Sequence, residues 1–210
     1  MSIITVSRGS YSRGKEVAEK LARELGYDCV SREVLLEASE QFDIPEIQLV
    51  HAIEDAPSIL DRLTHGKERY VAYVRAALLK RVQRGDVVYH GFAGHLLLRD
   101  APSVLKVRVI AAMEDRIQEV VSRDGVAEDE ARVRVARADH ERQKWSHHLY
   151  GVDPGEVELY DIVVQLPPMT VDDAVSTIKL AAQLPGFETT PEAKKTLEAL
   201  AAKAEAGAKS

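Results

Sequence analysis

The stretch Ser7-Arg8-Gly9-Ser10-Tyr11-Ser12-Arg13-Gly14-Lys15-Glu16 decides how the chain is organised. It joins a short apolar run at residues 3–6 to an amphipathic run at residues 17–25. Its glycines and its lysine fit the spacing G-x-x-x-x-G-K, in which successive backbone N–H groups surround a phosphate at the start of a helix. The sequence therefore predicts a phosphate-binding loop, and an ordinary glycine-rich turn is the alternative.

One residue of this loop departs from the pattern. The pattern ends in Ser or Thr, whose hydroxyl contacts Mg²⁺, whereas this chain has Glu16. A carboxylate can also hold Mg²⁺, so Glu16 is the candidate metal-binding residue. We assign donor-phosphate binding to the whole loop, that is to Gly9, Ser10, Tyr11, Ser12, Arg13, Gly14, Lys15 and Glu16.

The bulk properties limit the possible partners and the setting. The chain has 210 residues, of which 45% are hydrophobic and 30% charged, which suits one α/β domain. A net charge of −6 argues against a nucleic-acid partner. No apolar segment approaches the ~20 residues of a membrane span, and no signal peptide is seen, so we expect a cytoplasmic protein with no membrane partner. The single cysteine, Cys29, fits a reducing compartment and is expected in the core.

Short β-branched runs alternate with helical patterns along most of the chain. This alternation predicts a three-layer α/β/α sandwich around a five-stranded parallel sheet. A mostly helical insertion spans residues 33–84, and a charged helical segment spans residues 124–158. The five strands are expected at residues 3–6, 27–30, 87–89, 104–111 and 160–166.

The C-terminal segment differs in composition from the rest. Residues 187–210 are rich in Ala, Lys and Glu and poor in large apolar side chains. We expect a frayed helical or disordered tail outside the core, following a domain at residues 1–186.

Several short segments stand in an order that extends the loop pattern. They are Ser7-Arg8, Gly14-Lys15-Glu16-Val17-Ala18, Leu21-Ala22, Leu25-Gly26-Tyr27, Ser31-Arg32-Glu33, Gly91, Asp139, Arg142 and Tyr160-Asp161. From residue 2 to about residue 183, this order resembles the cytidylate kinase-like family of P-loop nucleoside monophosphate kinases. In that family an acidic residue at the position of Glu16 is familiar.

The resemblance implies transfer of the ATP γ-phosphoryl group to a nucleoside monophosphate, typically CMP or dCMP, with Mg²⁺. It implies that residues 33–84 bind the acceptor nucleotide and that residues 124–158 form a lid over the donor phosphates. Lys15, Arg137 and Arg142 are then the candidate catalytic residues, since positive charge is needed where negative charge spreads. Arg116 is expected to help bind the nucleotide, and Asp139 belongs with the substrate. Ion pairing on a solvated helix is the alternative for the lid arginines.

The acceptor half departs from the family. Cytidylate kinases have an Asp-Gly-Arg-Asp run after the third strand, whereas this chain has His90-Gly91-Phe92-Ala93. Phenylalanine cannot make a bidentate bond to phosphate. Arg32 and Gly91 remain the candidate substrate-binding residues on this side. His95 could contact a ligand or cap a helix, and Trp145 could stack on a base or pack against the core.

Two other functions stay open because of these departures. The chain could be a nucleotide-binding regulatory module that has lost transfer, or a kinase for a non-nucleotide acceptor. The sequence does not specify the oligomeric state.

Overall fold

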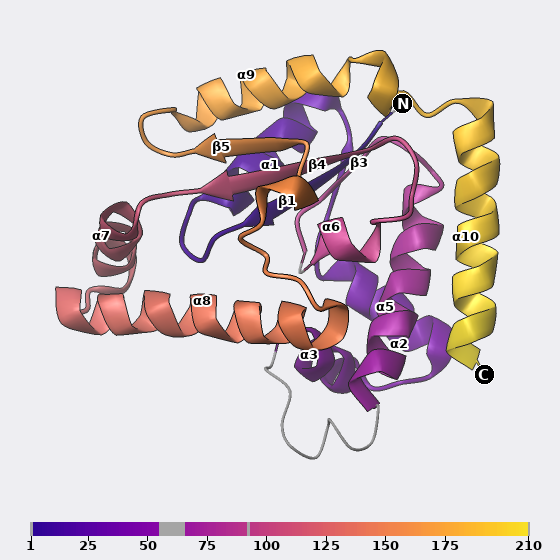
Figure 1. Cartoon of the computed structure of the whole chain (residues 1–210), viewed down its shortest axis with the longest axis horizontal. Helices are drawn as coiled ribbons and strands as arrows, with labels where there is room; N and C mark the ends of the chain where they lie inside the picture. The colour runs from indigo at the N-terminus through magenta and orange to yellow at the C-terminus, as the bar shows by residue number, and fades with distance from the viewer. Residues whose placement is uncertain (1, 55–65, 92, 210) are drawn as a thin grey trace.

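A five-stranded parallel sheet forms the centre of the computed structural model, which describes residues 2–54, 66–91 and 93–209. The strand order β2-β3-β1-β4-β5 places the first strand in the middle (Figure 1). Parallel pairing confirms the predicted α/β class. The strands are β1 (Ile3–Arg8), β2 (Asp28–Val30), β3 (Val87–Tyr89), β4 (Val104–Ile110) and β5 (Ile162–Gln165).

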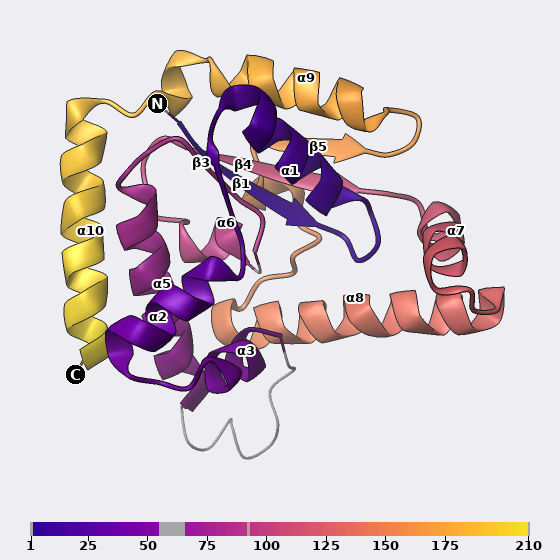
Figure 2. The same ribbon diagram turned by 180° about the vertical axis from the view of Figure 1, so that it is seen from behind.

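Alternate residues along each strand point to opposite faces of the sheet, because the strands are pleated. They therefore pack into two separate hydrophobic cores. Ile4 and Val6 of β1 pack with the helices α1 (Gly14–Leu25) and α9 (Val171–Ala182) on one face. Ile3 points the other way and packs with α5 (Gly66–Val82) and α6 (Gly94–Leu97). Figure 2 shows α1 in front of the strands, on the side opposite to that seen in Figure 1. The predicted three layers are therefore confirmed.

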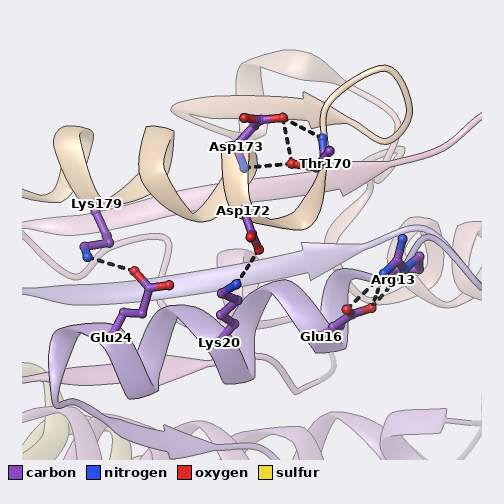
Figure 3. A network of polar contacts seen from close by, with 8 residues as sticks. All are labelled: Arg13, Glu16, Lys20, Glu24, Thr170, Asp172, Asp173 and Lys179. Carbon is purple, nitrogen blue, oxygen red and sulfur yellow. Dashed lines mark hydrogen bonds and ion pairs between the residues drawn. The ribbon is translucent and has the colours of Figure 1, made fainter.

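Polar contacts fasten α1 to α9 along their exposed sides. Lys20 pairs with Asp172, and Glu24 pairs with Lys179 at 2.8 Å (Figure 3). Thr170 and Asp173 form the predicted capping box at the start of α9. These pairs hold the helix behind the phosphate loop in a fixed place on the sheet.

The described parts of the two insertions are mostly helical, as predicted. The first contains α2 (Glu33–Phe42) and α3 (Glu46–Glu54) as well as α5. The second contains α7 (Met113–Asp124), which ends at Gly125, and the long α8 (Glu128–Tyr150). A 3-10 turn, η1 (Val157–Leu159), leads from α8 towards β5. Helix α8 crosses below the sheet in Figure 1, where it faces the carboxyl ends of the strands.

The expectation that the C-terminal segment lies outside the core is wrong. After the turn η2 (Pro185–Phe187), residues Pro191–Lys209 form α10, which runs beside α5 in both views (Figures 1 and 2). Leu197, Ala201 and Ala208 are buried in the same core as α5. Small alanine side chains let two helices approach closely, so a face with few large apolar residues is sufficient.

Cys29 also departs from its prediction, because it is exposed. It lies on β2, which is an edge strand of the sheet. Only Val30 of that strand is buried. None of the helices in the described ranges is long and apolar enough to cross a membrane.

Candidate functional site

Two adjoining cavities lie where the central strands end. The larger has a volume of about 780 Å³ and is called the central cavity below. The smaller has a volume of about 460 Å³, follows the phosphate loop, and is called the loop cavity. Open parallel sheets bind their ligands at this edge. Six cationic residues line the central cavity, namely Arg8, Lys15, Arg32, Arg108, Arg116 and Arg142.

The phosphate loop is fixed to the sheet by its own polar groups. The backbone N–H of Gly9 donates to the carbonyl of Val109 at 3.0 Å. The Ser12 hydroxyl contacts the carbonyls of Gly9 at 2.9 Å and Val109 at 3.0 Å. Tyr11 and Arg13 have φ angles of 61° and 59°, which L-residues rarely adopt. A turn held in this unusual conformation suggests a ligand-binding role.

Gly14 is required by the packing of the protein itself. A Cβ atom at this position would lie 2.6 Å from the Cβ atom of Arg8 and 3.3 Å from that of Val109. The helix α1 therefore starts in close contact with β1 and β4. At Gly9, by contrast, an added Cβ would be in ordinary contact with its protein neighbours, 3.7 Å from Ser12 at the nearest.

Lys15 and Glu16 both reach the loop cavity from the first turn of α1. The ammonium group of Lys15 lies 3.6 Å from Glu19, and 60% of its side chain is exposed. The carboxylate of Glu16 accepts two hydrogen bonds of 2.9 Å from Arg13 (Figure 3). Glu16 would have to share or leave this pair in order to hold Mg²⁺.

Ser10 contributes a buried hydroxyl to the loop cavity. The residue is 5% exposed, and within the described part of the chain its Oγ atom has no hydrogen-bond partner. Buried hydroxyls are normally hydrogen-bonded. An anion such as a phosphate would accept the proton of this hydroxyl, so Ser10 fits a phosphate ligand.

Helix α8, in the segment predicted to be a lid, reaches the loop through Arg142. Its Nη1 atom donates to the carbonyl oxygen of Arg8 at 2.6 Å. Burial lowers the pKa of Arg142, and the positive charge of Arg8 lowers it further. Arg8 and Arg142 both line both cavities, so these two cationic residues lie where the cavities adjoin.

Arg116 and Asp139 act as a pair. Nη1 of Arg116 donates to the Asp139 carboxylate at 2.7 Å and lies 3.5 Å from the carbonyl of Ser10. Only 12% of the Arg116 side chain is exposed. Asp139 therefore orients Arg116 towards the loop, in addition to lining the central cavity itself.

The other lid arginines lie further away. Arg137 is exposed on α8 and lines neither cavity. Arg132 pairs with Glu114 and Glu128 at 3.8 Å, as expected of a solvated helix face. The fold thus brings Arg116 and Arg142 to the loop and does not bring Arg137 there.

Two predicted substrate-binding residues, Arg32 and Gly91, also line the central cavity. The Nε atom of Arg32 donates to Glu46 at 2.7 Å. The packing explains Gly91, because an added Cβ would lie 2.2 Å from the Tyr89 hydroxyl. Ala93 adopts a φ of 52° at the start of α6. Phe92, which motivated the doubt about the acceptor, lies outside the described residues.

Four cavity residues were not among the predicted site residues, although Ser7 and Tyr160 lie in segments that carry the family resemblance. They are Ser7, His90, Arg108 and Tyr160, each at or near the carboxyl end of a strand or just before β5. Burial lowers the pKa of His90, with Arg8 as the next cause. The sequence signal that could have identified these residues is a polar side chain at the end of a buried strand. Trp145 is fully buried in the core, which favours packing over base stacking.

The model of the cytidylate kinase-like family matches residues 3–166, which is most of the chain. The chain belongs to the cytidylate kinase-like family. The cytidylate kinase of Ignicoccus hospitalis is 27% identical over 183 residues, which cover 85% of this chain and 98% of that enzyme. The cytidylate kinase of Methanopyrus kandleri is 27% identical over 188 residues, which cover 85% and 92% of the two chains. Family membership makes this protein a kinase.

Solved structures agree with the fold. An uncharacterized protein from Eubacterium ventriosum superposes with a TM-score of 0.65 at 20% identity, covering 86% of this chain and 98% of that one. Shikimate kinase from Bacteroides thetaiotaomicron superposes with a TM-score of 0.51 at 12% identity, covering 87% and 99%. These likenesses confirm the P-loop kinase fold of this family member.

Proposed function

We propose that this protein transfers the γ-phosphoryl group of ATP to a nucleoside monophosphate, and that CMP and dCMP are the preferred acceptors. A phosphate oxygen of the acceptor forms a new bond to the γ-phosphorus, the bond from that phosphorus to the bridging β-oxygen breaks, and ADP leaves. The observation that carries the proposal is a rigid phosphate loop beside a cavity lined by cations. The cytidylate kinases named above support the choice of acceptor.

The loop would hold the donor. Ser10, Lys15 and Glu16 line the loop cavity, and Lys15 adds a largely exposed positive charge. Hydrogen-bond donors and cations at this place stabilise the transition state of phosphoryl transfer, because negative charge accumulates on the phosphate oxygens. Their positions are set before the substrate arrives, since the loop is bonded to β4.

The lid segment at residues 124–158 would cover the transferred group. Arg142 and Arg116 already reach the central cavity, and Asp139 holds Arg116 in place. Guanidinium groups suit this task because they bind phosphate oxygens in a fixed geometry. Arg137 stays a candidate for the same task.

Glu16 follows Lys15 in the first turn of α1, and its carboxylate is the candidate ligand for Mg²⁺. Mg²⁺ is usually held by one or two carboxylates together with substrate phosphates and water, so a single protein ligand is sufficient. When bound, the ion would neutralise charge on the donor phosphates. We propose Glu16 for this place, in exchange for its pair with Arg13.

The insertion at residues 33–84 would hold the acceptor, with Arg32 directed to its phosphate. Arg32 pairs with Glu46 in an exposed position, where an ion pair is worth only ~0–1 kcal/mol. An acceptor phosphate can therefore displace Glu46 at little cost.

One assay tests the proposal. Purified protein is incubated with ATP, Mg²⁺ and separately CMP, dCMP, UMP, AMP and GMP, and ADP formation is followed. We expect ADP and CDP from CMP, and a loss of about 10²-fold or more in kcat/KM for Lys15→Ala. Lys20→Ala is the control, because Lys20 lies on the same helix, pairs with Asp172 and lines neither cavity.

Other outcomes separate the alternatives. Binding of ATP without turnover on any acceptor would favour a regulatory module. Turnover only on sugars or other non-nucleotide alcohols would favour the third possibility. Failure to bind ATP at millimolar concentration would contradict all three.

A further inference from the structure

A chain of four polar side chains lines the central cavity, beginning at Ser7 beside the phosphate loop. It consists of Ser7, His95, Tyr160 and Arg108, and all four line the cavity. Ser7 Oγ lies 2.6 Å from His95 Nδ1, and His95 Nε2 lies 3.2 Å from the Tyr160 hydroxyl. Ser7 and Arg108 are direct partners in the register of β1 and β4, so they lie side by side on the sheet.

The direction of these hydrogen bonds can be worked out from Pro154. Its carbonyl oxygen can only accept, so the Tyr160 hydroxyl donates its single proton there, over 3.0 Å. The Tyr160 oxygen must then accept from His95, which places the imidazole proton on Nε2. Nδ1 of His95 is therefore an acceptor, and the Ser7 hydroxyl donates to it.

His95 stays neutral in this setting. The residue is 5% exposed, and burial lowers its pKa to about 3, with Arg108 and Lys106 adding to the shift. The one proton of Ser7 is therefore directed to His95 Nδ1.

Because Ser7 Oγ donates its proton to His95, it can meet a ligand only with its lone pairs, that is as a hydrogen-bond acceptor. We infer that Ser7 Oγ is a specificity-determining group that accepts a hydrogen bond from an amino or hydroxyl group of the phosphoryl acceptor. This inference rests on the proposed function, which supplies the acceptor. A phosphate oxygen does not suit Ser7 itself, because it is an acceptor and would face the lone pairs of Ser7. The phosphates of the substrates instead belong beside the arginines of the loop and lid.

The inference distinguishes between chemically close acceptors. Cytosine carries an exocyclic amine where uracil carries a carbonyl oxygen, and CMP carries a 2′-hydroxyl that dCMP lacks. Ser7→Ala should lower kcat/KM about tenfold for acceptors that carry the recognised donor group, and should leave the analogue without it unchanged. Either the CMP/UMP ratio or the CMP/dCMP ratio then falls towards one.

Two further variants make the experiment specific. Thr5→Val is the matched control, since Thr5 lies two residues earlier on the same side of β1, is buried, and lies outside the central cavity. Its Oγ1 atom has no hydrogen-bond partner within the described residues, so both ratios should keep their values. Tyr160→Phe releases the proton of His95 Nε2 and should change the same ratio as Ser7→Ala, by a smaller factor.

The outcomes separate this inference from the proposed function. If the protein is active and Ser7→Ala leaves both ratios unchanged, or lowers all acceptors uniformly, the inference is wrong and the function stands. If no monophosphate is turned over, the proposed transfer is wrong, and calorimetric binding of CMP, UMP and dCMP decides the inference. A preference that disappears in Ser7→Ala then supports it, and the lack of any such preference overturns it.

Discussion

The guanidinium of Arg142 donates a 2.6 Å hydrogen bond to the backbone carbonyl of Arg8, and so ties the lid helix to the end of β1. The two residues are 134 positions apart in the chain. The positive charge of Arg8 also lowers the pKa of Arg142, and both residues line both cavities. This contact marks the place where we expect the transferred phosphoryl group.

Arg142 and Arg137 allow a comparison within a single helix. Arg142 lines both cavities, whereas Arg137 is exposed outside them. We expect Arg142→Met to lower kcat/KM by about tenfold or more, and Arg137→Met to have a smaller effect. Steady-state kinetics with ATP and CMP measure both. A larger loss in Arg137→Met would mean that α8 moves further during turnover than its contact with Arg8 indicates.

Glu16 can be tested through the metal. If it holds Mg²⁺, Glu16→Gln should raise the Mg²⁺ concentration for half-maximal activity several-fold, because a neutral amide is a weaker ligand than a carboxylate. Glu24→Gln is the control, since Glu24 lies on the same helix and pairs with Lys179 (Figure 3). An unchanged Mg²⁺ requirement in Glu16→Gln would limit Glu16 to its pair with Arg13.

The docking of α10 can be tested by stability. Leu197 is 1% exposed in the core shared with α5, and its carbonyl lies 3.4 Å from Gln83 Nε2. Leu197→Ala should lower the free energy of unfolding by ~2–4 kcal/mol, as in other buried leucines. Leu184→Ala should change it by less than ~0.5 kcal/mol, because Leu184 is 54% exposed. Urea denaturation measures both, and equal effects would argue against a docked α10.

His95 predicts how stability depends on pH. Its pKa is about 3 in the folded protein and near 6.5 in the unfolded chain, so the unfolded chain binds more protons between these values. Stability should therefore fall as the pH decreases from about 6.5 towards 3. Carboxylates with lowered pKa add to the loss at the acidic end, Glu33 among them.

A variant isolates the contribution of His95. His95→Gln removes the titrating group, so the free energy of unfolding should change less between pH 6.5 and 5 than in the unmodified protein. The slope against pH is compared rather than the absolute stability, since the substitution also disturbs Ser7 and Tyr160. Equal slopes would show that His95 does not stay neutral in the fold.

Local patterns were sufficient for much of the architecture. The strand at residues 87–89 and the capping box of Thr170 follow from residue types within a few positions, and both are confirmed. The loop between β1 and α1 also lies where its glycines indicate. Local sequence patterns gave the wrong burial for Cys29 and for residues 187–210, because burial depends on which element packs against a segment.

The amino-acid sequence alone specified the α/β alternation, the phosphate loop and the family, since each depends on spacing along the chain. It did not specify which polar side chains share a cavity. Arg142 meets Arg8, and Ser7 meets His95 and then Tyr160, only because parallel strands bring their carboxyl ends to one edge. The direction of hydrogen bonding from Ser7 to the carbonyl of Pro154 likewise follows from contacts between residues far apart in the chain, which no local spacing encodes.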